Sequence, residues 1–158
     1  MSKVISDHLV FRYAKVDEAF LLTTIALRSM SYWGYKDNEI EKCADLLTVD
    51  EELITTYPVI VVQDHEEVIG FAALKEVEGR PYLRHMWLDP SVIRLGLGRR
   101  LFDSILKEAR KFHYSEVLIN SDSHAEEFFL KLGAKKINEL ASEYMSKRKT
   151  SLLLYKVH

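Results

Sequence analysis

Val92-Ile93-Arg94-Leu95-Gly96-Leu97-Gly98-Arg99-Arg100 is the stretch around which the rest of the chain is organised. It follows an apolar strand candidate and an Asp89-Pro90 turn, and it opens a strongly amphipathic helix. Its two glycines remove side chains where the backbone bends, so an anion can lie close to exposed N–H groups. The first N–H groups of a helix lack internal partners and carry the positive end of the helix dipole, which favours phosphate. The stretch therefore predicts a diphosphate site, with a plain strand-to-helix turn that binds nothing as the alternative.

Two well-known nucleotide loops do not fit this glycine spacing. The dinucleotide fingerprint needs a third glycine three residues after the second, where this chain has Leu101. A Walker loop needs Gly-Lys-Ser or Gly-Lys-Thr, and neither tripeptide occurs in the sequence. The predicted anion is therefore not held by either of these loops.

The composition is that of an ordinary globular domain. The chain has 158 residues, of which 47% are hydrophobic and 29% charged, and we expect residues 1–158 to form a single domain. The net charge of -2 argues against a nucleic-acid partner and against a polybasic membrane surface. Cys43 is the single cysteine, and we see neither a signal peptide nor an apolar run long enough to span a membrane. We therefore expect a cytoplasmic protein that contacts no membrane.

Alternation and apolar runs predict the strands, whereas helical spacing and capping residues predict the helices. The expected strands are Leu9–Tyr13, Val59–Val62, Val68–Leu74, Tyr82–Leu88, Val117–Asn120, Ala134–Asn138 and Leu152–Val157. The expected helices are Val16–Ser31, Asp37–Leu47, a short segment from Thr48 to Thr55, the long helix after Gly98, and Ser123–Leu132. This order indicates an α/β sheet of mixed direction whose parallel part lies around the long helix.

Side-chain periodicity also assigns faces within two of these elements. In the first helix it places Val16, Phe20, Thr24 and Leu27 on one face. In the strand Tyr82–Leu88, strict alternation turns Tyr82, Arg84, Met86 and Leu88 one way and Leu83, His85 and Trp87 the other way.

The central stretch in its setting resembles the cofactor motif of the GNAT family, the GCN5-related N-acetyltransferases. The resemblance begins with Leu88-Asp89-Pro90, continues with Gly96-Leu97-Gly98 and includes the long helix that follows. The later pattern Ala125-x-x-Phe128-Phe129-x-x-x-Gly133 is similar to the second cofactor motif of that family. In all, the resemblance covers the chain from about Leu9 to Val157.

Membership of this family implies a definite fold and activity. The fold would be a mixed sheet of about six or seven strands flanked by about four helices, with two central parallel strands that splay apart. Tyr32-Trp33-Gly34-Tyr35 and His85-Met86-Trp87-Leu88 resemble a bacterial group of undefined substrate. The activity would be transfer of the acetyl group of acetyl-CoA to an amine, by direct attack in a ternary complex and without a metal.

The resemblance also implies where the donor lies. Backbone N–H groups from Leu95 to Arg99 would hold the CoA diphosphate, and the strand before them would pair with the pantetheine arm. The thioester would enter the gap between the splayed strands, next to the helix that begins near His124. The expected cofactor-binding residues are Met86, Trp87, Leu88, Ile93, Arg94, Leu95, Gly96, Leu97, Gly98, Arg99, Asn120, Ala125, Phe128 and Phe129.

Two residues are expected to act on the reacting atoms. A backbone N–H at Leu88 would polarise the thioester carbonyl as an oxyanion donor. His85 would take the proton of the acceptor ammonium, because histidine titrates near neutrality, although a histidine that packs structurally in the sheet is the alternative. Tyr32, Trp33 and Tyr35 would bind the acceptor or, alternatively, form a hydrophobic lid.

The chain departs from the family pattern at two positions. The Arg or Gln expected three residues before the first glycine is Ile93, with an arginine one residue later. The tyrosine whose hydroxyl commonly protonates the CoA thiolate is Phe129, so the general acid stays open, with Tyr155, Tyr144 and Ser121 as candidates.

Three functions therefore compete. The leading one is acetylation of a small-molecule primary amine. The others are acetylation of a protein or peptide, and a CoA-binding regulatory module that has lost its chemistry. Exposed C-terminal strands often pair subunits in this family, so a homodimer is a further expectation.

Overall fold

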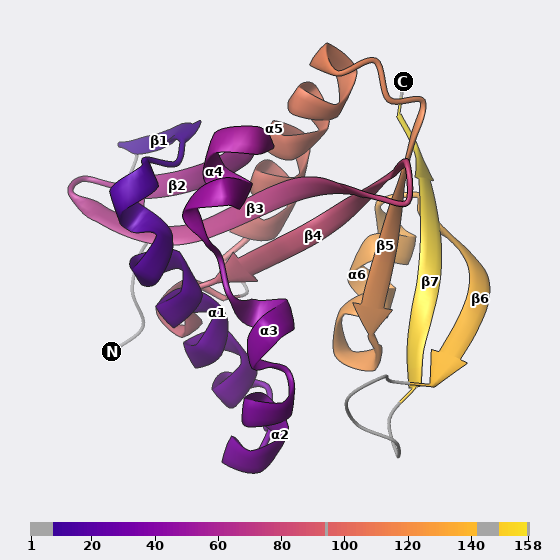
Figure 1. The fold of residues 1–158 in the computed structure, drawn as a ribbon, viewed down its shortest axis with the longest axis horizontal. Helices are drawn as coiled ribbons and strands as arrows, with labels where there is room; N and C mark the ends of the chain where they lie inside the picture. The colour runs from indigo at the N-terminus through magenta and orange to yellow at the C-terminus, as the bar shows by residue number, and fades with distance from the viewer. Residues whose placement is uncertain (1–7, 94, 142–148, 158) are drawn as a thin grey trace.

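The computed structural model describes residues 8–93, 95–141 and 149–157, and within them a seven-stranded sheet forms the centre of the molecule (Figure 1). Its strand order is β1-β2-β3-β4-β5-β7-β6, and every neighbouring pair except β4–β5 is antiparallel. The strands are β1 Leu9–Tyr13, β2 Val59–Asp64, β3 Glu67–Val77, β4 Arg80–Leu88, β5 Glu116–Asp122, β6 Lys135–Ala141 and β7 Lys149–Lys156. The predicted mixed α/β sheet is confirmed.

The described residues contain more helices than the sequence predicts. The α-helices are α1 Ala19–Tyr32, α2 Asp37–Lys42, α3 Ala44–Leu47, α4 Glu51–Thr56, α5 Leu97–Lys111 and α6 Ser123–Lys131; η1 Val16–Glu18 and η2 Pro90–Val92 are 3-10 turns. The predicted helix Asp37–Leu47 is interrupted at Cys43, where the Cys43 N–H closes a tighter turn on the Ile40 carbonyl at 3.0 Å. None of the helices in these ranges combines the length and the apolarity that a membrane span requires.

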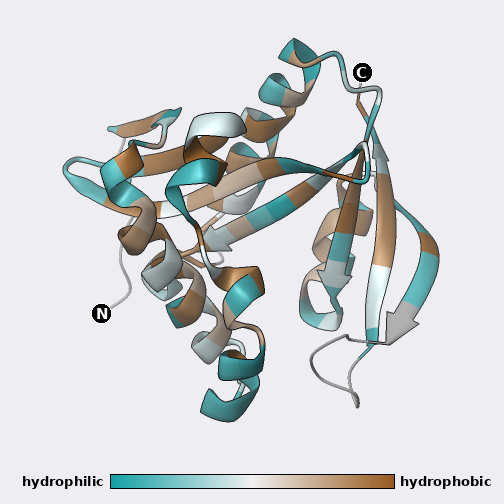
Figure 2. Cartoon of the chain, viewed as in Figure 1, coloured by the Kyte–Doolittle hydropathy of each residue, from teal (hydrophilic) through white to brown (hydrophobic). Residues whose placement is uncertain are grey.

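Each face of the sheet carries its own core, because residues of a strand alternate between the faces. Ile60 and Val62 of β2 pack with α5, whereas Val59 and Val61 pack with α1. Figure 2 shows apolar residues along β2 and hydrophilic residues on α2. The apolar stripe predicted for the long helix is confirmed for buried Leu101, Phe102, Ile105, Leu106 and Ala109, whereas Phe112, also predicted in this stripe, is the C-cap and is 47% exposed. Each such side chain contributes about 1.5–3 kcal/mol when it is fully buried.

The face of the first helix that periodicity indicates is not the face that packs on the sheet. Phe20 is 85% exposed, and the side chains of α1 that pack on the sheet are Leu22, Ile25, Ala26 and Met30. This helix is apolar on two sides, so periodicity alone cannot select the side that meets β3 and β4.

A β-bulge corrects the predicted alternation in β4. Ala73 pairs with His85 and Leu74 pairs with Leu83, so Arg84 is an extra residue on β4. Past the bulge the side chains change face: Leu83 packs in the same cluster as Met86 on the α5 side. Arg84 instead lies with His85 on the side of α3 and α4, where it contributes to a cavity.

The two parallel strands splay apart as predicted. Within the described residues, β4 and β5 are in register only at Tyr82 and Leu118. Beyond this pair β4 runs toward η2 while β5 runs toward α6, and the strands diverge (Figure 1).

Candidate active site

The edge of β4 along the splayed end carries polar backbone groups. The Asp89 N–H donates to the Ile69 carbonyl of β3 at 2.8 Å. Because successive residues of an antiparallel strand turn their N–H groups to opposite sides, the N–H groups of Met86 and Leu88 point toward β5. They do so where β5 is no longer in register with β4. This edge can therefore bind an added amide chain in the way that a sheet binds an extra strand.

The N-terminus of α5 lies at the end of this edge. Gly96 is the N-cap and has φ 80°, a left-handed conformation that glycine adopts without strain. The backbone N–H groups of the first turn, which includes Leu97, Gly98 and Arg99, have no partners within the helix. Leu97 is fully buried, so only its backbone can reach a ligand, whereas Leu95 and Arg99 are exposed. Arg94 lies outside the described residues.

Gly98 lies close to two side chains of the expected cofactor site. A Cβ atom at this position would lie 3.2 Å from Cζ of Phe128 and 3.8 Å from Cε of Met86. Gly98 thus joins three separate elements, α5, α6 and β4, at one point. Ile93 approaches this point in an extended conformation, and Arg100 lies over the Phe11 ring at 5.2 Å.

The α6 side of the gap is largely aromatic. Phe129 is 6% exposed, and its ring centroid lies 5.9 Å from that of Phe102 and 5.2 Å from that of Phe128. Its side chain is therefore part of the core. Phe128 and Ala125 are half-buried, and Asn120 is exposed on β5 beyond the Leu118 pairing.

His85 is buried, at 3% exposure, and is neutral. Its Nδ1 accepts a hydrogen bond from the Trp87 indole N–H at 3.1 Å, so the ring proton lies on Nε2. Burial, with smaller contributions from the charges of Arg84 and Lys75, lowers the pKa of His85 to about 3. The base role predicted for His85 does not fit this geometry, because the lone pair of Nδ1 is engaged by Trp87 and the ring binds protons weakly.

A buried carboxylate anchors the turn between β4 and α5. Asp89 is 4% exposed, and its Oδ1 accepts hydrogen bonds from the Ser91 N–H at 3.0 Å and the Ser91 hydroxyl at 2.8 Å. Its Oδ2 lies 2.9 Å from Nη1 of Arg28, a residue of α1. The turn that leads into the α5 N-terminus is thereby tied to the helix layer on the other face of the sheet.

An aromatic bridge, made of Trp33 and His124, links α1, which packs on β4, to α6, which packs on β5. Trp33 caps the C-terminus of α1, and its ring stacks on that of His124 in α6, with centroids 4.7 Å apart and planes at 23°. Tyr32 packs its edge against Trp33 at 5.2 Å and is 48% exposed. Tyr35 is 5% exposed in the α1–α4 core, and the edge of its ring lies against His124, with centroids 5.9 Å apart, so its role in acceptor binding stays a prediction.

Three groups in or beside the gap escape sequence reasoning. They are His124, which stacks on Trp33; Arg28, which pairs with Asp89; and Arg84. The first two are contacts between residues far apart in the chain, which local spacing does not encode. The third depends on the bulge, and a charged residue within an apolar strand is its one sequence signal.

A family model described as "Acetyltransferase (GNAT) domain" matches residues 35–145, which is more than half of the chain. The chain belongs to the GNAT acetyltransferase family. It is therefore an acyl-CoA-dependent N-acetyltransferase. The matched range holds the sheet from β2 to β6 and both glycine positions of the α5 N-terminus.

Solved structures of other GNAT proteins have the same fold. A GCN5-related N-acetyltransferase from Rhodopseudomonas palustris is similar with a TM-score of 0.79 over 98% of both chains, at 17% identity. The PaiA N-acetyltransferase from Thermoplasma acidophilum has a TM-score of 0.78, over 94% of this chain and 98% of its own, at 16% identity. The ribosomal-protein-S18-alanine N-acetyltransferase from Escherichia coli gives 0.72 over 94% of both chains, at 14% identity. No curated protein sequence matches the chain.

Proposed function

We propose that this GNAT protein transfers the acetyl group of acetyl-CoA to a primary amine of a small molecule by direct attack in a ternary complex. The observation that carries the proposal is the splayed β4 edge, with the N–H groups of Met86 and Leu88 turned toward β5 next to the N-terminus of α5. The edge would pair with pantetheine, the helix would hold the diphosphate, and the Leu88 N–H would polarise the thioester carbonyl. Residues 1–158 would act as one domain, which the single sheet between two cores supports.

A small acceptor is favoured by the aromatic bridge. The Trp33–His124 stack links the helices that pack on the two splayed strands, so an extended protein segment would have to separate the rings, whereas a small amine would pass beside them. The relatives include both kinds of enzyme: one is an aminoglycoside 6'-N-acetyltransferase complexed with coenzyme A, and another acetylates a ribosomal-protein alanine. Acetylation of a peptide is the competing outcome of the tests below.

The proton steps would use little help from the protein. His85 holds its proton on Nε2 and is a weak base, so we propose that the amine attacks as its free base. Phe129 supplies no hydroxyl, so the thiolate would leave without a proton from this position, which a thiol pKa of about 8.5 permits, and the proton that the nitrogen loses on forming the amide would pass to solvent.

Acetyl-CoA at about 100 times its Kd is expected to raise the melting temperature by about 5–10 °C, because a ligand that binds only the folded chain stabilises it. Thermal unfolding with acetyl-CoA, and with adenosine as a control that lacks the diphosphate and thioester, measures the effect. Release of free thiol across a panel of amines and peptides then measures the chemistry. A thermal shift without thiol release from any acceptor would favour the regulatory module, and the absence of a shift would remove the cofactor assignment.

The acid limb of kcat/KM is expected to follow the pKa of the amine rather than that of a histidine. An amine of low pKa should reach full rate at lower pH than an alkylamine, since each attacks as the free base. His85→Gln should leave both limbs in place, because His85 is neutral throughout this range. If the limb instead stays at one pH for all amines and disappears in His85→Gln, His85 is the base after all.

A further inference from the structure

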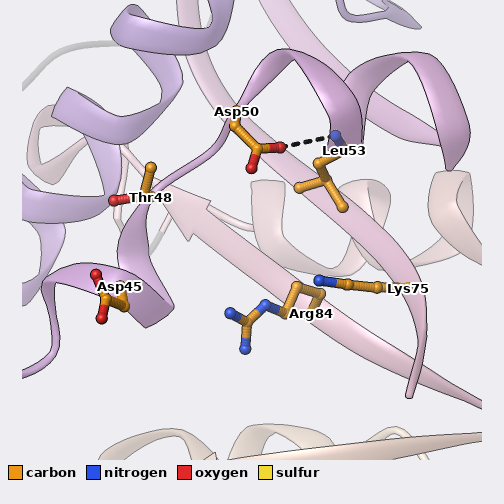
Figure 3. Close-up of a pocket in the computed structure, with 6 residues that line it drawn as sticks. All are labelled: Asp45, Thr48, Asp50, Leu53, Lys75 and Arg84. Atoms are coloured by element: carbon orange, nitrogen blue, oxygen red, sulfur yellow. Dashed lines mark hydrogen bonds between the residues drawn. The ribbon is translucent and has the colours of Figure 1, made fainter. Parts of the chain in front are cut away.

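The bulge at Arg84 creates a polar cavity next to the proposed reaction centre. This cavity has a volume of about 240 Å³ and lies between β3, β4 and the segment that carries α3 and α4 (Figure 3). It is lined by Asp45, Thr48, Asp50, Leu53, Lys75 and Arg84. Without the extra residue in β4, the Arg84 side chain would alternate to the opposite face, so the bulge supplies the cavity with its guanidinium.

The walls of this cavity carry opposite charges. Lys75 and Arg84 come from the strands, whereas Asp45 and Asp50 come from the helical segment (Figure 3). Asp50 caps α4, since its Oδ1 accepts the Leu53 N–H at 2.8 Å, and the Thr48 hydroxyl donates to the Ala44 carbonyl at 2.7 Å. In the part of the chain that the structure describes, neither the Lys75 ammonium nor the Asp45 carboxylate forms an ion pair, so both can bind a ligand.

The cavity borders the strand that carries the proposed reaction centre. Arg84 and Lys75 are close enough to His85 for their charges to lower its pKa. Met86 and Leu88 follow Arg84 by two and four residues, which is about 7 and 13 Å along an extended strand. To bring a primary amine to the β4 edge, a molecule held in the cavity by one end would have to span this distance, less the part that the Arg84 side chain itself covers.

We propose that this cavity binds a zwitterionic head group of the acceptor, with a carboxylate against Lys75 and Arg84 and an ammonium against Asp45. The acceptor would then be an α-amino acid with a second primary amine, and the second amine would be the one that is acetylated. A guanidinium and an ammonium bind a carboxylate by charge-assisted hydrogen bonds, and an opposite carboxylate binds the ammonium in the same way. This substrate class rests on the proposed acetyltransferase function.

Four compounds separate the two charges of the head group. Lysine and ornithine carry both charges, 6-aminohexanoate lacks the α-ammonium, and cadaverine lacks the carboxylate. We expect kcat/KM for lysine or ornithine to exceed that of either control compound by about 10- to 100-fold, because a hydrogen bond to a charged group adds about this much in affinity. Mass spectrometry of the product should locate the acetyl group on the side-chain amine.

Two variants test the two walls, and two exposed residues of α5, on the other face of the sheet, supply matched controls. Arg84→Gln should reduce kcat/KM for lysine toward the value for cadaverine, and it should leave kcat/KM for cadaverine unchanged. Asp45→Asn should reduce kcat/KM for lysine toward the value for 6-aminohexanoate, and it should leave kcat/KM for 6-aminohexanoate unchanged. Lys107→Gln and Asp103→Asn remove one positive and one negative charge from α5. Neither should change the ratio of kcat/KM values between any two compounds.

Calorimetric binding of the same compounds to the protein without acetyl-CoA separates this inference from the proposed function. If lysine binds more tightly than both control compounds and Arg84→Gln removes the difference, the inference stands even when no acetyl transfer occurs. Equal binding of lysine, cadaverine and 6-aminohexanoate overturns the inference. Acetyl transfer that is insensitive to Arg84→Gln and Asp45→Asn also overturns it, while leaving the proposed function intact.

Discussion

Gly98→Arg is expected to weaken acetyl-CoA binding by at least about 100-fold, the largest effect of any single substitution that we predict. A Cβ atom at Gly98 already lies 3.2 Å from Phe128, so a longer side chain must displace that ring or extend over the first turn of α5. Either way it covers backbone N–H groups that would hold the diphosphate. Loss of two charge-assisted hydrogen bonds costs about 3–6 kcal/mol, which exceeds a hundredfold in affinity.

The thermal shift and the calorimetric affinity for acetyl-CoA measure this effect. The melting temperature of each variant without ligand shows whether the substitution also destabilises the fold. Gly98→Ala should show an intermediate loss, because one methyl group needs a displacement of only a few tenths of an ångström at Phe128. Gly79→Ala is a control for lost stability alone: Gly79 has φ 78° in the turn between β3 and β4, so the substitution strains the backbone there without touching α5. An unchanged affinity in Gly98→Arg would mean that the diphosphate binds elsewhere.

The second large effect is a loss of folding stability in acid that depends on His85. Unfolded histidine has a pKa near 6.5, whereas burial lowers the pKa of His85 in the folded chain to about 3. Between these values the unfolded state binds a proton that the folded state does not, so stability falls as the pH falls. The slope is about 1.4 kcal/mol per pH unit, which amounts to about 2 kcal/mol between pH 6 and pH 4.5.

Urea unfolding at a series of pH values measures this slope. His85→Gln should flatten it, because glutamine does not titrate, whatever the variant does to stability at neutral pH. His8→Gln removes an exposed histidine before β1 and should keep the wild-type slope. If the wild type and His85→Gln lose stability in parallel from pH 6 to pH 4.5, His85 is accessible to protons in the folded chain.

Local signals were sufficient for most of the architecture. The β-branched run Val59–Val62 and the amphipathic stripe after Gly98 correspond to β2 and α5. Both could be predicted because burial of these elements leaves a strong local pattern in the sequence. The Asp89-Pro90 turn and the two glycines likewise lie where a strand leads into a helix. These are the elements that give the α5 N-terminus its position.

The side-chain chemistry of the site was much less predictable, because it depends on contacts made in three dimensions. One inserted residue in β4 turned Arg84 to the other face, and alternation has no means of anticipating a bulge. Tyr35 lies in an aromatic run that suggested a binding surface, yet it is buried against α1. The proton affinity of His85 depends on burial and on charges from two strands, neither of which local spacing reveals.

The aromatic bridge has a consequence for how often the site opens. In the described ranges, β4 and β5 are in register at the single pair Tyr82–Leu118, and the Trp33–His124 stack joins α1 on the β4 side to α6 on the β5 side. An aromatic contact of this kind contributes about 1 kcal/mol beyond the apolar area that it buries, and the Tyr35 ring, 5.9 Å from that of His124, adds a second contact. A bridge made of a few such ring contacts would open and close by thermal motion, so acceptors and products could exchange without a separate conformational switch.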